Sequence, residues 1–254
     1  MSIGIILMGL LIGFMVGLTG VGGAALLTPI LILLGFSPSI AVGTDLVYNS
    51  ITKLFGSFQH WRQKTINLTL VKYLAIGSIP SAICAVWILH LFDSFFHNQE
   101  LVIKHALGYV LILVALTTLI KTFAISKLDE NPLQKKPIHE KRGLTICIGV
   151  ILGFIVGLTS IGSGSLFALA MLYLYRMSPS ELVGTDIAHA FLLVTAAGFM
   201  HAGIGNVNYL LVFNLLTGSI PGVLIGSTLS SRLPAKPLRT IMAIMILISG
   251  VKLI

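Results

Sequence analysis

Charged residues are scarce in this chain. Only 9% of its 254 residues are Asp, Glu, Lys or Arg, whereas 56% are hydrophobic, with a mean hydropathy of +1.01. A soluble globular domain carries about 25% charged residues. Several apolar runs also reach the roughly 20 residues that a helix needs to cross a bilayer. The composition therefore excludes a soluble fold and predicts an all-α polytopic membrane protein surrounded by lipid.

Cysteine and acidic residues are also few. Cys84 and Cys147 both lie in apolar segments, where free cysteines in the protein core are expected rather than a disulfide or a metal site. Asp and Glu number 8 against 16 Lys and Arg, which gives a formal charge of +8. In a membrane protein this excess is expected in cytoplasmic loops, so no nucleic-acid partner is predicted.

Motifs for catalysis and for cofactors are missing from the sequence. There is no Walker-type phosphate loop and no His/Cys/Asp/Glu cluster with zinc or copper spacing. The run Gly162-Ser-Gly-Ser stands in an apolar helical context, not at a strand-to-helix elbow. The N-terminus lacks a basic residue before its apolar run, so no removable signal peptide is expected. We predict a protein that is not an enzyme and needs no cofactor and no metal.

An internal repeat organises the chain into two halves. Residues 13–26 match residues 153–166 at an offset of 140, and polar residues then stay in register at an offset of 141. The predicted divisions are an N-terminal transmembrane repeat (1–126), a cytoplasmic linker (127–142) and a C-terminal transmembrane repeat (143–254). The repeated polar motifs are Ser37-Pro-Ser with Ser178-Pro-Ser, Val42-Gly-Thr-Asp45 with Val183-Gly-Thr-Asp186, His60 with His201, Asn67 with Asn208, and Gly77-Ser-Ile-Pro80 with Gly218-Ser-Ile-Pro221.

The first apolar segment of each half decides the topology. Residues 3–34 and 143–175 are each too long for one span and too short for two. If each segment is one long crossing, the repeats are parallel. If each segment is a re-entrant pair broken by glycine, three full crossings follow it and the repeats are inverted. The inverted arrangement gathers more Lys and Arg on one side, so the positive-inside rule favours it, with both termini outside.

Both of these first segments are broken at glycine or serine. A helix that restarts at Gly22 or Gly162 directs its positive N-terminal end into the membrane, where it can bind an anion. Paired Gly-broken segments in two halves indicate a transporter's binding site. The alternative is that small residues only permit close helix packing. The predicted substrate-binding residues of the breaks are Gly20, Gly22 and Gly23 in the first repeat and Ser160, Gly162, Ser163 and Ser165 in the second.

Polar residues in the second helix of each half are candidates for substrate binding, coupling or gating. Asp45, Asn49 and Lys53 are spaced four residues apart and share one helix face. Lys53 either pairs structurally with Asp45 or attracts the anion. Thr44 or Asp45 alternatively caps the start of this helix. The other candidates for coupling or gating are Thr185, Asp186 and His189 in the second half, and His60 and His201, which can exchange protons or lie at the interface.

These motifs together resemble the TauE/SafE family of bacterial sulfite-exporter-like permeases. The resemblance rests on Gly17-Leu-Thr-Gly-Val-Gly-Gly, Pro29, Ser37-Pro-Ser, Ala41-Val-Gly-Thr-Asp45 and His60, and on their second copies. It implies export of sulfite or an organosulfonate across the bacterial inner membrane. The second copy departs from the first, because Ser160 and Ser163 replace Gly20 and Gly23, and Val194 stands opposite Lys53.

The sequence therefore predicts a secondary transporter of a small anion held mid-membrane, and the resemblance implies that the anion contains sulfur and is exported. A transporter of a cation or neutral metabolite that uses Asp45 and Asp186 is the alternative. A membrane-embedded enzyme or scaffold would need a catalytic dyad or a large polar surface, and the sequence offers neither. A homo-oligomer is compatible with each interpretation.

Overall fold

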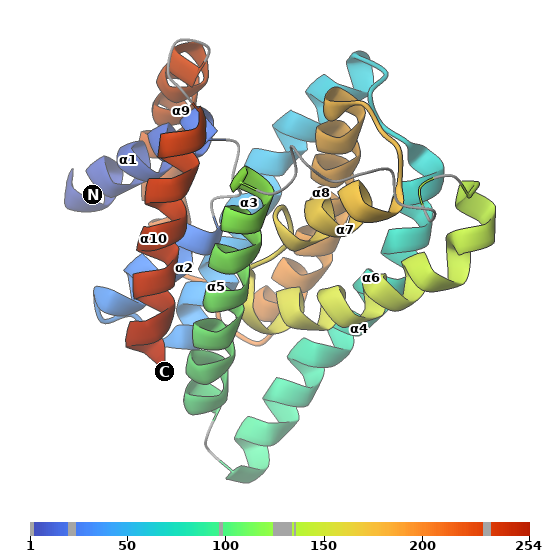
Figure 1. Cartoon of the computed structure of the whole chain (residues 1–254). Coiled ribbons are helices and arrows are strands. Elements are labelled where there is room, and N and C mark those ends of the chain that lie inside the picture. The colour runs from blue at the N-terminus through green and yellow to red at the C-terminus, as the bar shows by residue number, and fades with distance from the viewer. Residues whose placement is uncertain (1–2, 20–23, 97–98, 124–133, 135, 231–234) are drawn as a thin grey trace.

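The computed structural model consists of helices packed side by side (Figure 1). It describes the chain except for residues 1–2, 20–23, 97–98, 124–133, 135 and 231–234. The helices among the described residues are α1 (Ile3–Thr19), α2 (Ala24–Leu33), α3 (Pro38–Arg62), α4 (Leu68–Phe96), α5 (Gln99–Phe123), the 3-10 helix η3 (Ile138–Lys141), α6 (Arg142–Thr159), α7 (Leu166–Leu174), α8 (Pro179–Gly203), α9 (Tyr209–Ser230) and α10 (Ala235–Leu253).

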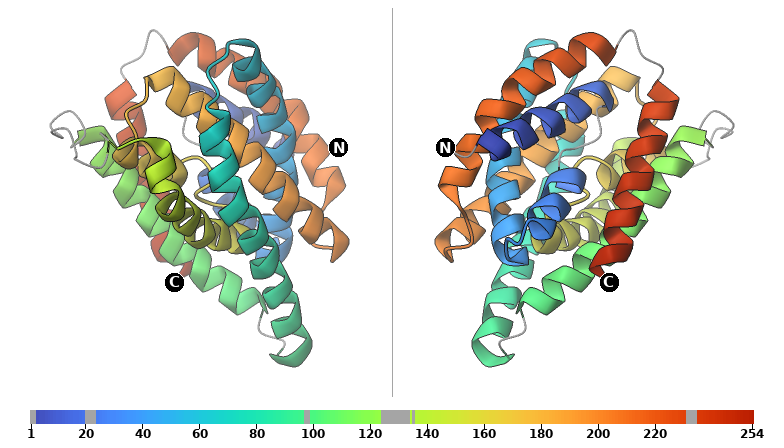
Figure 2. Two further views of the ribbon diagram at one scale, coloured as in Figure 1. Left: turned by 90° about the vertical axis from the view of Figure 1, so that its right-hand side faces the viewer. Right: turned by 90° about the vertical axis from the view of Figure 1, so that its left-hand side faces the viewer.

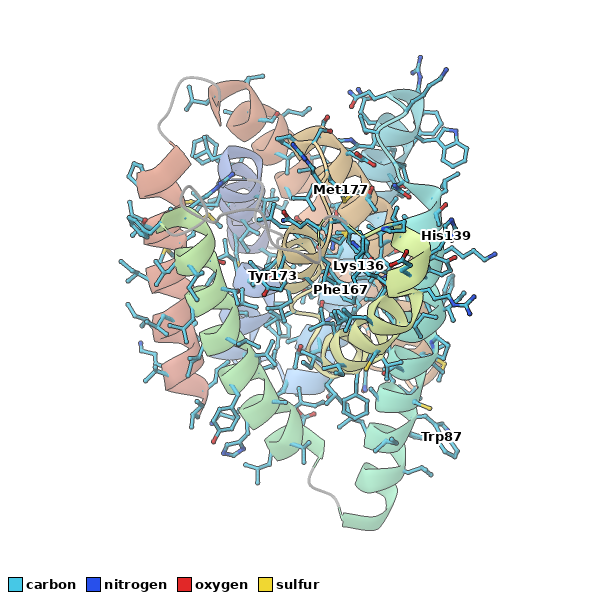
Figure 3. The ribbon with its side chains drawn as sticks, turned by 45° about the vertical axis from the view of Figure 1, so that its right-hand side comes forward. Trp87, Lys136, His139, Phe167, Tyr173 and Met177 are labelled. Atoms are coloured by element: carbon cyan, nitrogen blue, oxygen red, sulfur yellow. The ribbon has the colours of Figure 1, made fainter. Side chains whose placement is uncertain are left out.

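The distribution of polar and apolar side chains is that of a membrane protein. Large apolar side chains such as Phe199 (75% exposed) cover the outside, whereas Asp45 and His201 are fully buried. Trp87 likewise projects outward from α4, and Phe167 lies in the interior (Figure 3). Five helical segments of the described chain are long and apolar enough to span a bilayer: Leu68–Leu91, Glu100–Ile120, Ile138–Thr159, Pro179–Gly203 and Tyr209–Leu229. The chain is therefore a multi-pass integral membrane protein.

The two cysteines correct one prediction from the sequence. Cys84 on α4 and Cys147 on α6 are both free, but both are exposed rather than part of the core. In a membrane protein the lipid-facing side of a helix is as apolar as the side that faces the protein. Apolar sequence context alone therefore could not distinguish the two positions.

The helices of the two repeats pack in matching pairs. Helix α1 lies along α9, and its repeat counterpart α6 lies along α4 in the same way (Figure 2). Helices α3 and α8, which correspond to each other, also pack together, as do α5 and α10. Each half thus contributes to the packing of the other, and neither half forms a separate domain in space.

Glycines determine how closely these paired helices approach. A Cβ added at Gly13 would collide with the backbone of Ser219 on α9, and one at Gly153 with the backbone of Ser78 on α4. Small residues at such crossings let helix backbones pack directly against each other. Close helix packing, the alternative considered for the Gly-rich segments, therefore explains the glycines within α1 and α6. Close packing does not explain the glycine and serine residues of the connection that follows α6.

We expect Gly153→Ala to destabilise the protein by about 1–3 kcal/mol, because its methyl group has to displace backbone atoms of α4. Thermal unfolding of the purified protein in detergent measures the effect. Gly143→Ala, in the first turn of the same helix, is the matched control, because nothing lies within 4 Å of the added Cβ. An equal loss of stability in the two variants would contradict this account of the crossing.

Helices α3 and α8 run antiparallel across the middle of the molecule. Near their crossing the hydroxyl groups of Ser50 and Thr195 are 2.6 Å apart. Gly184, near the start of α8, lies against His60 and Thr65 at the end of α3. The same contact recurs at the other end, where Gly43 lies against His201 and Asn206. The start of each helix therefore adjoins the end of the other.

Both of these helices begin before their Val-Gly-Thr-Asp motifs. Helix α3 starts at Pro38 after Ser37, and α8 starts at Pro179 after Ser178, whose side chain accepts a hydrogen bond from the backbone N–H of Glu181. Proline fits the first position of a helix because its missing N–H has no intrahelical partner there. Asp45 therefore lies about two turns inside α3, and the alternative that Thr44 or Asp45 caps this helix is wrong.

Helix α7 returns toward the start of α6. Lys141, at the end of η3, donates a hydrogen bond of 2.7 Å to the carbonyl oxygen of Leu174, and its ammonium lies 4.1 Å from the ring centre of Tyr175. The hydroxyl groups of Tyr175 and Thr145 are also hydrogen-bonded. The end of α7 is thus fixed beside the beginning of α6. The connection between them, residues 160–165, lies at the opposite end of this helical hairpin.

Candidate functional site

The buried carboxylate of Asp45 is the centre of a polar cluster. It accepts hydrogen bonds from Thr28 (2.8 Å), Ser160 (2.7 Å) and the side-chain amide of Asn49 (2.7 Å). Asp45 has no exposed surface, and Asn49 is only 3% exposed. A buried charged group is tolerated when hydrogen bonds replace the water it has lost. The Asn49 contact confirms that α3 presents these polar residues on one face.

The Asp45 cluster joins the two halves of the chain. Thr28 comes from α2 and Asp45 from α3, both in the first repeat, whereas Ser160 follows α6 in the second. Ser160 ends α6 in the left-handed conformation, with a φ of 63°. This φ is uncommon for a residue other than glycine and reverses the chain direction after the helix. The break in the second repeat therefore lies against α3 of the first.

Lys53 reaches the same connection from two turns further along α3. Its ammonium donates a hydrogen bond to the hydroxyl of Ser163 at 2.8 Å and lies 3.4 Å from the carbonyl oxygen of that residue. Among the described residues, the carboxylates of Asp186 and Asp45 lie near enough to Lys53 for their charges to interact with its ammonium group. Two residues of α3 thus hold the 160–165 connection, one through a carboxylate and the other through an ammonium group.

The 160–165 connection ends where α7 begins. Gly162 has a φ of 102°, a conformation that residues other than glycine rarely adopt. Its carbonyl oxygen accepts a hydrogen bond of 3.2 Å from the backbone N–H of Leu166. Ser165 is the residue before the first turn of α7, and its side chain makes no capping hydrogen bond. The positive N-terminal end of α7 is therefore directed at the segment that carries Ser163.

His189 and Asp186 lie one turn apart on α8, close to this centre. The Nε2 atom of His189 is 2.8 Å from the Ser78 hydroxyl, and its ring packs on Phe167 with the ring centres 4.4 Å apart. Asp186 is 7% exposed and lies near enough to Lys53 on α3 for the two charges to interact. The structure therefore brings Asp186, His189 and the second-repeat break to one side of α3.

Thr44 and Thr185 are structural links between helix and loop. The Thr44 hydroxyl accepts the backbone N–H of Asn208 at 3.1 Å, and the Thr185 hydroxyl accepts that of Asn67 at 3.0 Å. Each link ties α3 or α8 to the turn that follows its counterpart. Both residues are buried and adjoin the aspartates, but their hydroxyl groups are used for these loop contacts.

The two repeat-related histidines occupy different environments. His60 is partly exposed at the end of α3, where its Nδ1 lies 2.8 Å from the Thr65 hydroxyl. His201 is fully buried, with its Nε2 atom 3.2 Å from the carbonyl oxygen of Gly157 on α6. Helix α6 therefore covers His201, whereas His60 stays partly open, and a position of either histidine at the membrane interface remains a prediction. Their partners are Thr65 and Gly157 rather than residues of the Asp45 cluster.

Some predicted residues fall outside this description, and some observed ones were missed. Gly20, Gly22 and Gly23 lie outside the residues that the structure describes. Thr28 was missed because a single threonine in an apolar run carries no periodic signal. Ser78 belongs to the repeated Gly-Ser-Ile-Pro motif, which could have identified it. No group of three or more His, Cys, Asp or Glu side chains converges within the described part of the chain.

Two cavities of about 240 Å³ flank α3. One lies against α9, with Thr52 and Ser219 among its lining residues, and the other lies against α8, with Ser50 and Thr195. Their described lining residues are otherwise mostly apolar and include no charged side chain. The charged groups of the site are therefore on the face of α3 that meets the 160–165 connection.

Several long apolar helices around a buried, charged and hydrogen-bonded centre are typical of a polytopic membrane protein. The family model described as sulfite exporter TauE/SafE matches residues 5–253. The chain therefore belongs to the TauE/SafE family and is a membrane transporter.

Curated relatives agree with this class. "Probable membrane transporter protein YjnA" of Bacillus subtilis is 68% identical over 254 residues, which is 100% of both chains. "Probable membrane transporter protein YunE" of the same organism is 26% identical over 268 residues, covering 98% of this chain and 96% of the relative. "Probable membrane transporter protein MJ0441" of Methanocaldococcus jannaschii is 29% identical over 167 residues, covering 63% and 57%. No solved structure matches the chain.

Proposed function

We propose that the protein is a secondary transporter that exports a small sulfur-containing anion, such as sulfite or an organosulfonate, across the bacterial inner membrane. The observation that carries the proposal is the contact of 2.8 Å between the Lys53 ammonium and Ser163, just before the N-terminal end of α7. An ammonium group, a hydroxyl donor and the positive end of a helix all favour negative charge.

The anion binds between α3 and the 160–165 connection in this proposal. Lys53 supplies the charge, Ser163 and Ser165 supply hydroxyl donors, and the backbone of the connection supplies N–H groups. Ser160 has a different part, because its hydroxyl donates to Asp45 and fixes the end of α6. Gly20, Gly22 and Gly23 of the first-repeat break, which lie outside the described residues, stay candidates for binding the anion in the proposal.

The sulfur-containing substrate is supported by the family rather than by the contacts. The family description names sulfite export, whereas the relatives' names give no substrate. A pyramidal or tetrahedral oxyanion has several acceptor oxygens and suits donors that converge from different elements. The proposed direction of transport, export from the cell, also rests on the family description.

Asp45 and Asp186 are proposed to couple transport to protons. Both carboxylates lie near Lys53, so an anion that binds beside this lysine meets net negative charge unless one of them takes up a proton. Asn49 donates a hydrogen bond to Asp45, and His189 lies one turn from Asp186 on α8, so both are proposed to take part in coupling. His60 and His201 are the remaining candidates for the proton path. The same pair of carboxylates supports the second candidate function, transport of a cation or a neutral metabolite.

The fold supports inverted repeats with re-entrant first segments. Equivalent helices α3 and α8 are antiparallel, and two equivalent spans that cross in opposite directions belong to oppositely oriented repeats. The return of α7 to the start of α6 supports a re-entrant hairpin, with Ser160 and Ser163 at its tip in the proposal. In the proposal, alternating access opens the site first to one side of the membrane and then to the other.

Cysteine labelling from each side of the membrane tests this topology. Single cysteines replace Leu34, Lys64, Arg176 and Gly203 in a background where Cys84 and Cys147 are serine. Because α3 and α8 are antiparallel, Lys64 and Arg176 should react from the cytoplasm, and Leu34 and Gly203 from outside. Parallel repeats would place Leu34 and Arg176 on the same side, so labelling of both from one side contradicts the proposal.

Flux into and out of proteoliposomes tests the proposed function. Radiolabelled sulfite, an alkylsulfonate, a carboxylate of similar size and a monovalent cation are compared, with and without a pH gradient. We expect saturable flux of the sulfur oxyanions that responds to the gradient. Flux of the cation alone would support the second candidate function, and flux of none of the anions would exclude the first.

A further inference from the structure

The turn between α3 and α4 lines a cavity of about 600 Å³ that is separate from the transport site. Trp61, Arg62, Lys64, Ile66 and Leu68 line it. Trp61 is 60% exposed and Leu68 is 55% exposed. The Arg62 guanidinium lies 6.0 Å above the ring of Phe58, which is itself exposed. Two cations thus lie beside exposed apolar surface at the start of a membrane-spanning helix.

The second repeat forms the same turn without these side chains. In the first repeat the N–H of Lys64 bonds to Trp61 at 3.1 Å and that of Thr65 to His60 at 3.2 Å. In the second, the N–H of Gly205 bonds to Ala202 at 3.2 Å and that of Asn206 to His201 at 2.9 Å. Ala202, Gly203 and Gly205 occupy the positions of Trp61, Arg62 and Lys64. The backbone of the turn therefore does not require the aromatic and basic residues.

Lys64 is moreover a poor residue for its backbone conformation. Its φ is 56°, and Gly205 has a φ of 81° at the equivalent position. Glycine adopts a positive φ without steric cost, whereas a lysine side chain does so at the expense of stability. A lysine at this position fits a role in binding better than a role in folding.

We propose that the cavity lined by Trp61, Arg62 and Lys64 binds the headgroup of an anionic phospholipid, of the phosphatidylglycerol type. The two cations pair with the phosphodiester, and the indole lies at the level of the headgroups. Exposed Phe58 and Leu68 lie beside the acyl chains. A free phosphate would use the cations but gain nothing from the exposed apolar side chains, so the arrangement favours a lipid. The equivalent turn of the second repeat lacks this set of side chains, so the proposal assigns the lipid to the first-repeat turn.

Lipid binding to the full-length protein in neutral detergent tests this proposal by native mass spectrometry. Dioleoyl phosphatidylglycerol should bind about 25-fold more tightly than dioleoyl phosphatidylcholine, since each basic residue near the headgroup contributes about fivefold. The W61A/R62G/K64G variant, which takes the second-repeat residues, should lose this preference. R62Q/K64Q should lose it as well, and it remains informative if the triple variant does not fold.

The control K136Q/K252Q removes the same charge at exposed positions elsewhere and should keep the preference. An excess of inorganic phosphate should not displace the lipid. Equal binding of the two lipids, a retained preference in R62Q/K64Q, or displacement by phosphate would overturn the proposal. Sulfite flux is measured in parallel, and its outcome bears on the transport site alone.

Discussion

Asp45→Ala should unfold at a markedly lower temperature and should lose transport. The substitution leaves the donors of Thr28, Asn49 and Ser160 buried without their acceptor. Each unsatisfied buried donor costs about 1–3 kcal/mol, part of which side-chain rotation recovers, so a total loss of about 3 kcal/mol is expected. Thermal unfolding in detergent and flux in proteoliposomes measure the two effects.

Asp45→Asn separates stability from coupling. The asparagine retains one side-chain oxygen as an acceptor, and the hydroxyl groups of Thr28 and Ser160 can rotate to accept from its amide. We expect a loss of about 1 kcal/mol together with flux that no longer responds to a pH gradient. Glu140→Gln, which neutralises an exposed carboxylate, is the control and should leave both properties unchanged. A stable Asp45→Asn protein with normal proton-dependent flux would exclude Asp45 from coupling.

Lys53→Met should abolish anion transport while the protein still folds. The methionine keeps most of the side-chain volume but removes the ammonium that contacts Ser163. Loss of the ammonium that pairs with the proposed anion typically costs about 2–5 kcal/mol, so anion affinity should fall by about 100-fold or more. Equilibrium binding of radiolabelled sulfite measures the affinity, and proteoliposome flux measures the rate.

Two further variants define what the lysine does. Lys53→Arg keeps the charge and should retain part of the affinity, whereas Ser163→Ala should reduce affinity by about tenfold, as expected for loss of one charge-assisted hydrogen bond. If Lys53→Met leaves anion flux intact, the anion site lies elsewhere. If the variant instead transports a cation faster, the two aspartates form a cation site, as the second candidate function requires.

The sequence predicted the polar face of α3 well because helix periodicity alone places Asp45, Asn49 and Lys53 on one side. The repeated Gly and Ser residues also predicted that the first helical segment of the second half is interrupted. In the structure this interruption lies at residues 160–165, between α6 and α7. Its position against α3 of the other half depends on packing between the repeats. No local pattern carries that information.

Other features depended on contacts between distant segments. Thr28 became a member of the site only because α2 brings it to Asp45, 17 positions away in sequence. His201 resembled its counterpart His60 in sequence, yet α6 buries one and not the other. One alternative from the sequence began α3 at Thr44 or Asp45, because threonine and aspartate are good capping residues, and this start is too late. Ser37 with Pro38 forms an earlier start that competes successfully.

The position of the bound anion tests the central claim most directly. An experimental structure of the protein with selenite, an electron-dense analogue of sulfite, would locate the anion by its anomalous signal. The account predicts a selenium peak between α3 and the 160–165 connection, with its oxygens within hydrogen-bond distance of Lys53 and Ser163. A peak elsewhere in the membrane region, with Lys53 still bound to Ser163, would contradict it.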